Sequence, residues 1–250
     1  MLKIDLQFFG GRGSSSGGLP TAEPNGSGPR AGSGKFTNAP AYVPETLREA
    51  LGKKGRPMSM ENAVRGANPY YDGSYREFSE NCQRAVVAYE ARRRGYNVTA
   101  QPTFEGDVLP QGNVGGKGNG RWQGAFKGAK SESVGASNGD KVVSNIEKKM
   151  ADYGDGSRAI VKIQWKNGDG HVFNVERKNG KTYYVDAQIG AKYNPKQLFS
   201  QVKPQSTRIV RTDNLKFSDR MKKSVEQSGV RTSAKKMDQV QKNKSDRKKK

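Results

Sequence analysis

The sequence predicts an α+β domain in which one helix packs on an antiparallel sheet, with disordered polar extensions at both ends. A helical stretch with marked ends lies near residues 79–95, and three alternating apolar runs split by Gly-rich turns lie near 157–190. Only 32% of the 250 residues are apolar, and the formal net charge is +21. Because globular chains are on average about 45–50% apolar, we expect one modest core rather than two domains.

The composition also limits the class of protein. No run approaches the roughly 18 apolar residues that a membrane-spanning helix needs, and the opening MLKIDLQFF is too short for a signal peptide. One cysteine cannot form an internal disulfide, and one cysteine with one histidine cannot build a zinc site alone. We therefore expect no membrane span, no bound metal and no cofactor.

Composition shifts along the chain predict three regions. Residues 1–60 combine a short leader with a Gly-, Ser- and Pro-rich linker, which cannot bury enough apolar surface to offset chain entropy. Residues 61–205 hold the helical and alternating patterns and are the predicted domain. Residues 206–250 are a basic tail that ends in QKNKSDRKKK without apolar periodicity, and we expect most of this tail to be disordered.

The segment SENCQRAVVAYEARRRG is predicted to be a helix. Ser79 is a suitable N-cap, and Gly95 can adopt the left-handed conformation that ends a helix. Cys82 then falls in the first turn, where unpaired backbone N–H groups and the helix dipole favour a thiolate. Cys82 also lies at the edge of a predicted buried stripe, so a small core residue is the alternative interpretation. The other members of that stripe are Ala85, Val86 and Tyr89.

The three alternating runs follow one another in SRAIVKIQWKNGDGHVFNVERKNGKTYYVDAQIG. Asn179 and Gly180 indicate a two-residue type I′ hairpin between the second and third runs. This turn fixes the register and places His171 diagonal to Asp186, within reach of a hydrogen bond. A His–Asp pair of this kind is either part of a catalytic site or a structural pair in which the two buried side chains hydrogen-bond to each other. The other predicted pairs are Arg177 with Thr182 and Val175 with Tyr184.

Together, the helix and the sheet would supply a thiol, a base and a group that orients the base. An activated cysteine nucleophile generally needs these three parts. The order Cys, His, Asp, with the cysteine on a helix and the other two on neighbouring strands, matches the papain-like arrangement. The sequence therefore predicts a papain-like domain whose nucleophile helix packs on the antiparallel sheet.

Two stretches carry a resemblance to a known family. The chain resembles the papain-fold toxin domain of the glutamine deamidase type in two runs, ANPYYDGSYREFSENCQRAVVAYEARRRGYNVTAQP and, after it, GHVFNVERKNGKTYYVDAQ. Such domains occur in bacterial polymorphic toxins and in phage minor head proteins. The resemblance covers about residues 66–195. It implies that Cys82 is the nucleophile, His171 the general base and Asp186 the residue that orients the base.

The resemblance also singles out two further residues. Gln188 belongs to the same VD-x-Q element as Asp186, and Asn81 precedes the nucleophile, so both are candidates for substrate or oxyanion contacts. The chain departs from the family pattern at Ala85, where many relatives carry a second cysteine, but one thiol suffices for the chemistry. The Gly- and Ser-rich stretch at residues 125–143 does not match clearly.

The opening MLKIDLQFFGGRGSSSG resembles the leaders of phage and mobile-element head proteins. This resemblance implies a place in a virion, inside the capsid, with later entry into the bacterial host cytoplasm. It also implies that the leader docks to phage head or portal components.

The sequence leaves two functions open. The first is a cysteine amidohydrolase that deamidates glutamine in a host protein, with peptide cleavage or acyl transfer as other uses of the same residues. The second is a non-catalytic virion protein that binds DNA without sequence preference through its basic surface and tail. A nuclease fits less well, because the chain lacks a carboxylate cluster for metal-dependent cleavage. The candidate nucleic-acid contacts are Arg231, Lys235, Lys236, Lys242, Lys244, Arg247, Lys248, Lys249 and Lys250.

Overall fold

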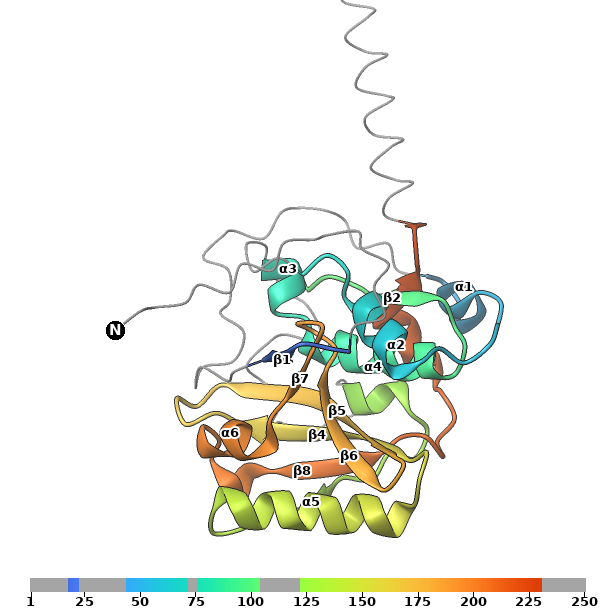
Figure 1. The fold of residues 1–250 in the computed structure, drawn as a ribbon. Helices are drawn as coiled ribbons and strands as arrows, with labels where there is room; N and C mark the ends of the chain where they lie inside the picture. The colour runs from blue at the N-terminus through green and yellow to red at the C-terminus, as the bar shows by residue number, and fades with distance from the viewer. Residues whose placement is uncertain (1–17, 23–43, 72–75, 104–121, 231–250) are drawn as a thin grey trace, which may run out of the picture.

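The computed structural model describes residues 18–22, 44–71, 76–103 and 122–230. Figure 1 shows a central sheet between two layers of helices. This arrangement confirms the predicted α+β class, with a mostly antiparallel sheet and a helix packed on it. The leader, most of the predicted linker and residues 231–250 lie outside the described residues, so the disorder expected there stays a prediction.

Within the described residues, the main sheet has seven strands in the order β1-β7-β6-β5-β4-β8-β3. All neighbouring strands are antiparallel except β1 and β7, which pair in parallel at one edge. The three runs expected from the sequence are the central strands β4, β5 and β6. The strands are β1 (Thr21–Ala22), β3 (Glu132–Ser133), β4 (Arg158–Gln164), β5 (Gly170–Lys178), β6 (Lys181–Asp186), β7 (Ala191–Tyr193) and β8 (Arg208–Arg211).

The hairpin between β5 and β6 has the predicted turn and register. Asn179 and Gly180 have φ values of 52° and 73°, which are the positive values that a type I′ turn requires. Arg177 pairs with Thr182, and the remaining pairs follow from this register. The register brings the start of β5 beside the end of β6, where the candidate site lies.

Helix α4 (Cys82–Arg93) begins at the cysteine, in keeping with the predicted place of Cys82 in the first turn. The predicted N-cap is wrong, because Ser79 is the last residue of the short helix α3 (Arg76–Ser79). Asn81 directly precedes α4, and its side chain makes no capping hydrogen bond. Gly95 has a φ of 99°, which confirms the predicted end of the helix.

Helix α4 is buried nearly all round, and not only along the predicted stripe. One side packs on β5 of the main sheet. The other sides contact α2 (Met60–Ala67), the strand β2 (Val98–Ala100) and the 3₁₀ helix η1 (Trp122–Ala125). The polar residues of α4 must therefore find partners inside the protein.

Two glutamates, one on α4 and one on the neighbouring strand β5, are paired with arginines in the interior. Glu176 on β5 accepts hydrogen bonds from Arg93 Nε at 2.8 Å and from Tyr89 Oη at 2.5 Å. Glu90 on α4 lies 2.8 Å from Arg158 Nε on β4. Both glutamate side chains are at most 1% exposed. These ion pairs fix the position of α4 on the sheet, and with it the position of Cys82.

Replacing Glu176 with glutamine should lower the free energy of unfolding by about 3 kcal/mol, because the Arg93 charge would lose its partner in a poorly hydrated place. Glu132→Gln is the matched control, since Glu132 pairs with Lys149 at the surface and should matter by less than about 1 kcal/mol. Urea denaturation measures both values. Equal losses in the two variants would show that the buried pair does not hold α4.

The other face of the sheet is covered by α5 (Gly139–Tyr153) and α6 (Pro195–Ser200) (Figure 1). Helix α5 could not be predicted from the sequence pattern, because its start lies in the Gly- and Ser-rich stretch at residues 125–143. Three apolar side chains at helical spacing nevertheless bury its inner face. They are Val142, Ile146 and Met150.

The folded region extends beyond the predicted bounds of 61–205. On the N-terminal side, α1 (Leu47–Leu51) packs on the 3₁₀ helix η3 (Asp219–Lys223). On the C-terminal side, β8 joins the main sheet and β9 (Val225–Gln227) pairs with β2. Apolar side chains in these added segments are buried, which the basic composition concealed. No helix in the described ranges has the length and apolar character to span a membrane.

Candidate active site

The structure brings Cys82, His171 and Asp186 together from three elements. Cys82 is the first residue of α4, His171 lies at the start of β5, and Asp186 ends β6. His171 Nε2 lies 2.8 Å from Asp186 Oδ2, as the register predicts. Because Nε2 faces Asp186, Nδ1 is the ring nitrogen left to interact with Cys82, which contributes to the raised pKa of His171. All three residues are at most 1% exposed.

The surroundings of His171 favour its protonated form. Burial by itself lowers the pKa of His171, but the charge of Asp186 and the hydrogen bond to it act in the opposite direction, with a further contribution from Cys82. The net result raises the pKa of His171 from 6.5 to about 10. The imidazole is therefore a cation at neutral pH and carries a proton that it can give to a leaving group.

Asp186 receives hydrogen bonds at both carboxylate oxygens. Tyr193 Oη donates to Oδ2 at 2.5 Å, and the Gln188 backbone N–H donates to Oδ1 at 2.9 Å. Burial by itself raises the pKa of Asp186, but His171, Tyr193 and the Gln188 N–H together lower it. The carboxylate thus stays ionised and can orient His171 without taking its proton. Sequence reasoning missed Tyr193.

Aromatic rings hold the plane of the imidazole. The Trp165 ring stacks on His171 with centroids 5.8 Å apart and an interplanar angle of 24°. Phe173 lies on the same face of the sheet, with its centroid 6.4 Å from that of His171 and an angle of 27°. The alternating pattern could have identified Trp165, because it lies directly after β4 and two residues beyond Ile163 of the apolar face.

Asn81 belongs to an amide network that supports the start of α4. Asn68 Nδ2 donates to Asn81 Oδ1 at 3.1 Å, and Asn81 Nδ2 donates in return to Asn68 Oδ1 at 2.9 Å. Asn81 Nδ2 also donates to the carbonyl oxygen of Gln101 at 3.3 Å. Both amide hydrogens of Asn81 are thus engaged. The structure assigns Asn81 to the support of the helix, and its side chain has no hydrogen left for the oxyanion contact expected from the sequence.

Gln188 lies between the start of α4 and the end of β6. Its Nε2 donates to the carbonyl oxygen of Ser79 at 2.5 Å, and its backbone oxygen accepts from Asn68 Nδ2 at 2.8 Å. Its Oε1 is buried and finds no hydrogen-bond partner in the described part of the chain. A buried acceptor without a partner is costly, so this atom is a candidate to receive an N–H group of a substrate.

The remaining candidates from the sequence lie in the basic tail. All nine, from Arg231 to Lys250, fall outside the described residues, so their role in nucleic-acid binding stays a prediction. Across the ranges that the structure describes, no group of three or more His, Cys, Asp or Glu side chains is placed to hold a metal ion.

A thiol at a helix N-terminus, an imidazole and a carboxylate on neighbouring strands define the papain-like class of domain. Residues 80–191 match the family model described as papain fold toxin 1, glutamine deamidase. This match confirms the resemblance to a papain-fold toxin domain that the sequence shows. Neither the curated proteins nor the solved structures compared with the chain include a match.

Proposed function

We propose that the domain hydrolyses the side-chain amide of glutamine in a protein substrate, with Cys82 as nucleophile, His171 as general acid and base, and Asp186 as the residue that orients His171. The placement of His171 between the thiol and the ionised carboxylate is the observation that carries this proposal. The family match supports the choice of a glutamine amide over other acyl groups.

The reaction proceeds in two halves. The Cys82 thiolate attacks the amide carbon, and the oxyanion is stabilised by N–H groups at the start of α4, including that of Cys82. His171 gives its proton to the leaving nitrogen, ammonia departs and a thioester remains. His171 then takes a proton from water as the water attacks the thioester. The products are glutamate and the regenerated thiol, so one water is consumed for each ammonia released.

The unpaired Oε1 of Gln188 would help to select the substrate. A primary amide carries two N–H donors, and one of them can satisfy this buried acceptor. An ester offers no such donor and would leave Oε1 unpaired. We therefore expect the domain to prefer amides over the corresponding esters, although esters are chemically more reactive.

The direct test is mass spectrometry of bacterial lysate incubated with the full chain. Conversion of glutamine to glutamate at defined sites, with release of ammonia, is the expected result. New peptide termini would identify a protease, and glutamine joined to an amine would identify acyl transfer. Either finding would overturn deamidation while keeping the same residues in their roles.

Tyr193→Phe should reduce kcat by about tenfold with little change in KM, because Asp186 would lose the hydroxyl that helps to hold it against His171. Tyr184→Phe is the matched control. The Tyr184 hydroxyl donates to Glu147 at 3.0 Å on the sheet face covered by α5, and its removal should leave kcat unchanged. Equal kcat in wild type and Tyr193→Phe would show that Tyr193 does not position Asp186.

We also propose, from the resemblance of the leader, that a phage-type particle carries the domain and releases it into the bacterial cytoplasm. The leader would hold the protein to head or portal components. Mass spectrometry of purified particles, with and without the leader sequence, tests this location. The net charge of +21 favours a second role in binding DNA, either beside catalysis or in its place.

A further inference from the structure

The C-terminal end of α4, which is remote from Cys82, borders a groove. It has a volume of about 400 Å³, which is within the size range of small-ligand sites. Arg94, at the end of α4, lines it, and twelve residues of helix separate Arg94 from Cys82, or about 18 Å. The groove is therefore a separate feature from the candidate active site. Its lining residues are Leu47, Leu51, Lys54, Pro57, Arg94, Tyr96, Lys216 and Phe217.

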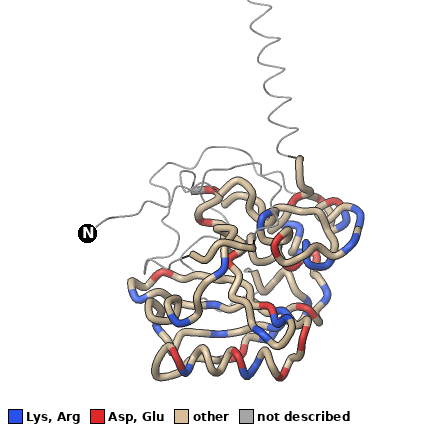
Figure 2. Tube along the Cα trace, viewed as in Figure 1, with Lys and Arg blue, Asp and Glu red and all other residues tan. Residues whose placement is uncertain are grey.

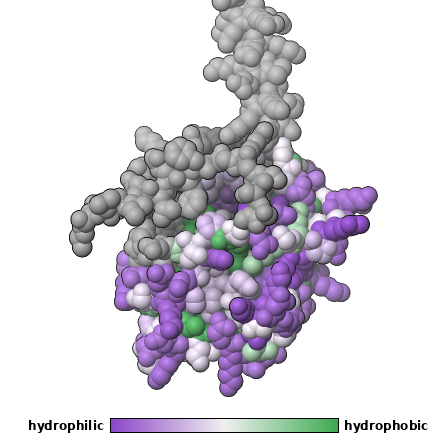
Figure 3. Space-filling view, viewed as in Figure 1, coloured by the Kyte–Doolittle hydropathy of each residue, from purple (hydrophilic) through white to green (hydrophobic). Residues whose placement is uncertain are grey.

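The charged groups that line this groove are all cationic. Lys54 and Lys216 are exposed at its edge. Lys53, Arg56 and Lys127 are exposed close to them in the chain, and the Lys127 N–H donates to the carbonyl oxygen of Lys216 at 2.8 Å. Figure 2 shows Lys and Arg gathered on the side of the molecule that carries α1, and Figure 3 shows hydrophilic side chains projecting there. The rim thus suits an anionic ligand.

The floor of the groove contains two aromatic rings held in a fixed arrangement. The Tyr96 and Phe217 rings meet edge to face, with centroids 6.2 Å apart. The guanidinium of Arg94 lies 4.2 Å from the centroid of Phe217. Arg94 is itself fixed by Glu90 and by the carbonyl oxygens of Leu215 and Thr212. Rigid aromatic side chains with cations at the edge suit a flat ring that carries an attached negative charge.

The last described strand, β9, contacts α1, which contributes Leu47 and Leu51 to the groove. Gln227 Nε2 in β9 donates to the carbonyl oxygen of Glu49 in α1 at 2.8 Å, and α1 also packs on η3. From Val230 the sequence continues into residues 231–250, which contain nine Lys and Arg and two Asp. A chain that carries both this cationic groove and a run of cations in its sequence favours a long, regularly charged polyanion over a short acidic peptide.

We propose that this groove binds a base of single-stranded nucleic acid, with the flanking phosphates on Lys54 and Lys216. A single strand exposes its base faces for stacking, whereas a duplex hides them, so the aromatic floor favours the single strand. The groove would supply the stacking that the tail, which has no aromatic residue after Phe217, does not offer. This inference does not rest on the proposed deamidation, and Cys82→Ala should bind nucleic acid as tightly as the wild type.

Fluorescence anisotropy of the full chain with labelled dT15 and with a 15-base-pair duplex tests the proposal. Tyr96→Leu should weaken binding of dT15 by about fivefold or more and leave duplex binding unchanged, because only the single strand stacks on the ring. Lys54→Glu/Lys216→Glu should weaken dT15 by about tenfold or more and flatten its salt dependence. Lys54 and Lys216 are exposed, so this variant remains informative even if Tyr96→Leu fails to fold.

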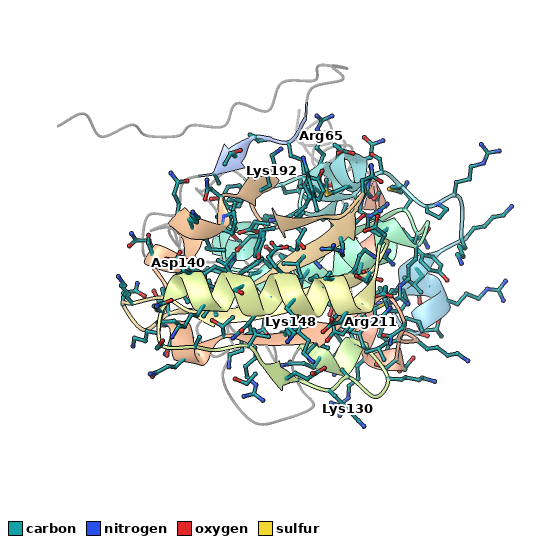
Figure 4. The ribbon with its side chains drawn as sticks, turned by 60° about the horizontal axis from the view of Figure 1, so that its bottom comes forward. Arg65, Lys130, Asp140, Lys148, Lys192 and Arg211 are labelled. Atoms are coloured by element: carbon teal, nitrogen blue, oxygen red, sulfur yellow. The ribbon has the colours of Figure 1, made fainter. Side chains whose placement is uncertain are left out.

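The matched control is Lys141→Glu/Lys148→Glu, which makes the same change in charge on α5. Both lysines are exposed on α5, which covers the opposite face of the sheet, and Lys148 is labelled in Figure 4. This control should keep dT15 binding within about twofold of the wild type. Equal losses of dT15 affinity in the two charge variants would show that the net charge of the protein alone attracts the strand. Unchanged dT15 binding by folded Tyr96→Leu, or tighter binding of an acidic apolar peptide than of dT15, would also overturn the proposal.

Discussion

Cys82→Ala should lower the rate of glutamine conversion by about 10⁴-fold or more, because the variant has no atom that can form the thioester. The side chain is buried at the start of α4, and alanine is only slightly smaller than cysteine. The fold, including the contacts of His171 with Asp186 and Trp165, should therefore persist. The measurement is the amount of glutamate formed in a purified substrate found in the lysate experiment, together with released ammonia.

Two variants make this result specific. Cys82→Ser keeps a hydroxyl in place of the thiol and should be almost as inactive, since serine is a far weaker nucleophile beside an imidazolium. Lys148→Ala, on the exposed side of α5, should keep full activity. Circular dichroism and urea midpoints close to those of the wild type show that the variants are folded. Substantial conversion by Cys82→Ala would mean that another group performs the chemistry.

The pairing of His171 with Asp186 could be predicted from the sequence, because residues close to them in the chain determine it. Asn179 and Gly180 accept positive φ values, and once they set the turn, the alternation of the strands places His171 beside Asp186. The first turn of α4 could be recognised in the same way from the residues around Cys82. What these patterns could not give was the distance between helix and sheet, which depends on packing of distant segments.

The supporting residues could not be predicted, because long-range contacts place them. Tyr193 reaches Asp186 only after the chain turns back into β7. Asn68 meets Asn81 through the packing of α2 against α4. Ser79 looked like an N-cap because a hydroxyl before an apolar run is locally favourable, but α3 occupies that position. That residues 206–230 are folded could not be predicted for another reason. Their few apolar side chains are spread among many charged ones.

Asp186→Asn should lower kcat by about 10²-fold or more. The carboxylate accepts hydrogen bonds from Tyr193 and from the Gln188 N–H while it faces the protonated His171. An asparagine offers one acceptor oxygen and an NH₂ donor, so at least one of these donors would face another donor in a buried site. The variant also loses the charge that raises the pKa of His171. This loss gives the prediction a second measurement.

In the wild type, folding raises the pKa of His171 from 6.5 to about 10, so the protonated imidazole, set between Cys82 and Asp186, stabilises the folded state. This stabilisation is fully present below about pH 6.5 and is lost as the pH rises to about 10. Urea midpoints should therefore fall over this range in the wild type and in the Tyr184→Phe control, and fall much less in Asp186→Asn. An equally steep fall in Asp186→Asn would assign the pH dependence to other groups, and unchanged kcat would show that Asp186 does not orient His171.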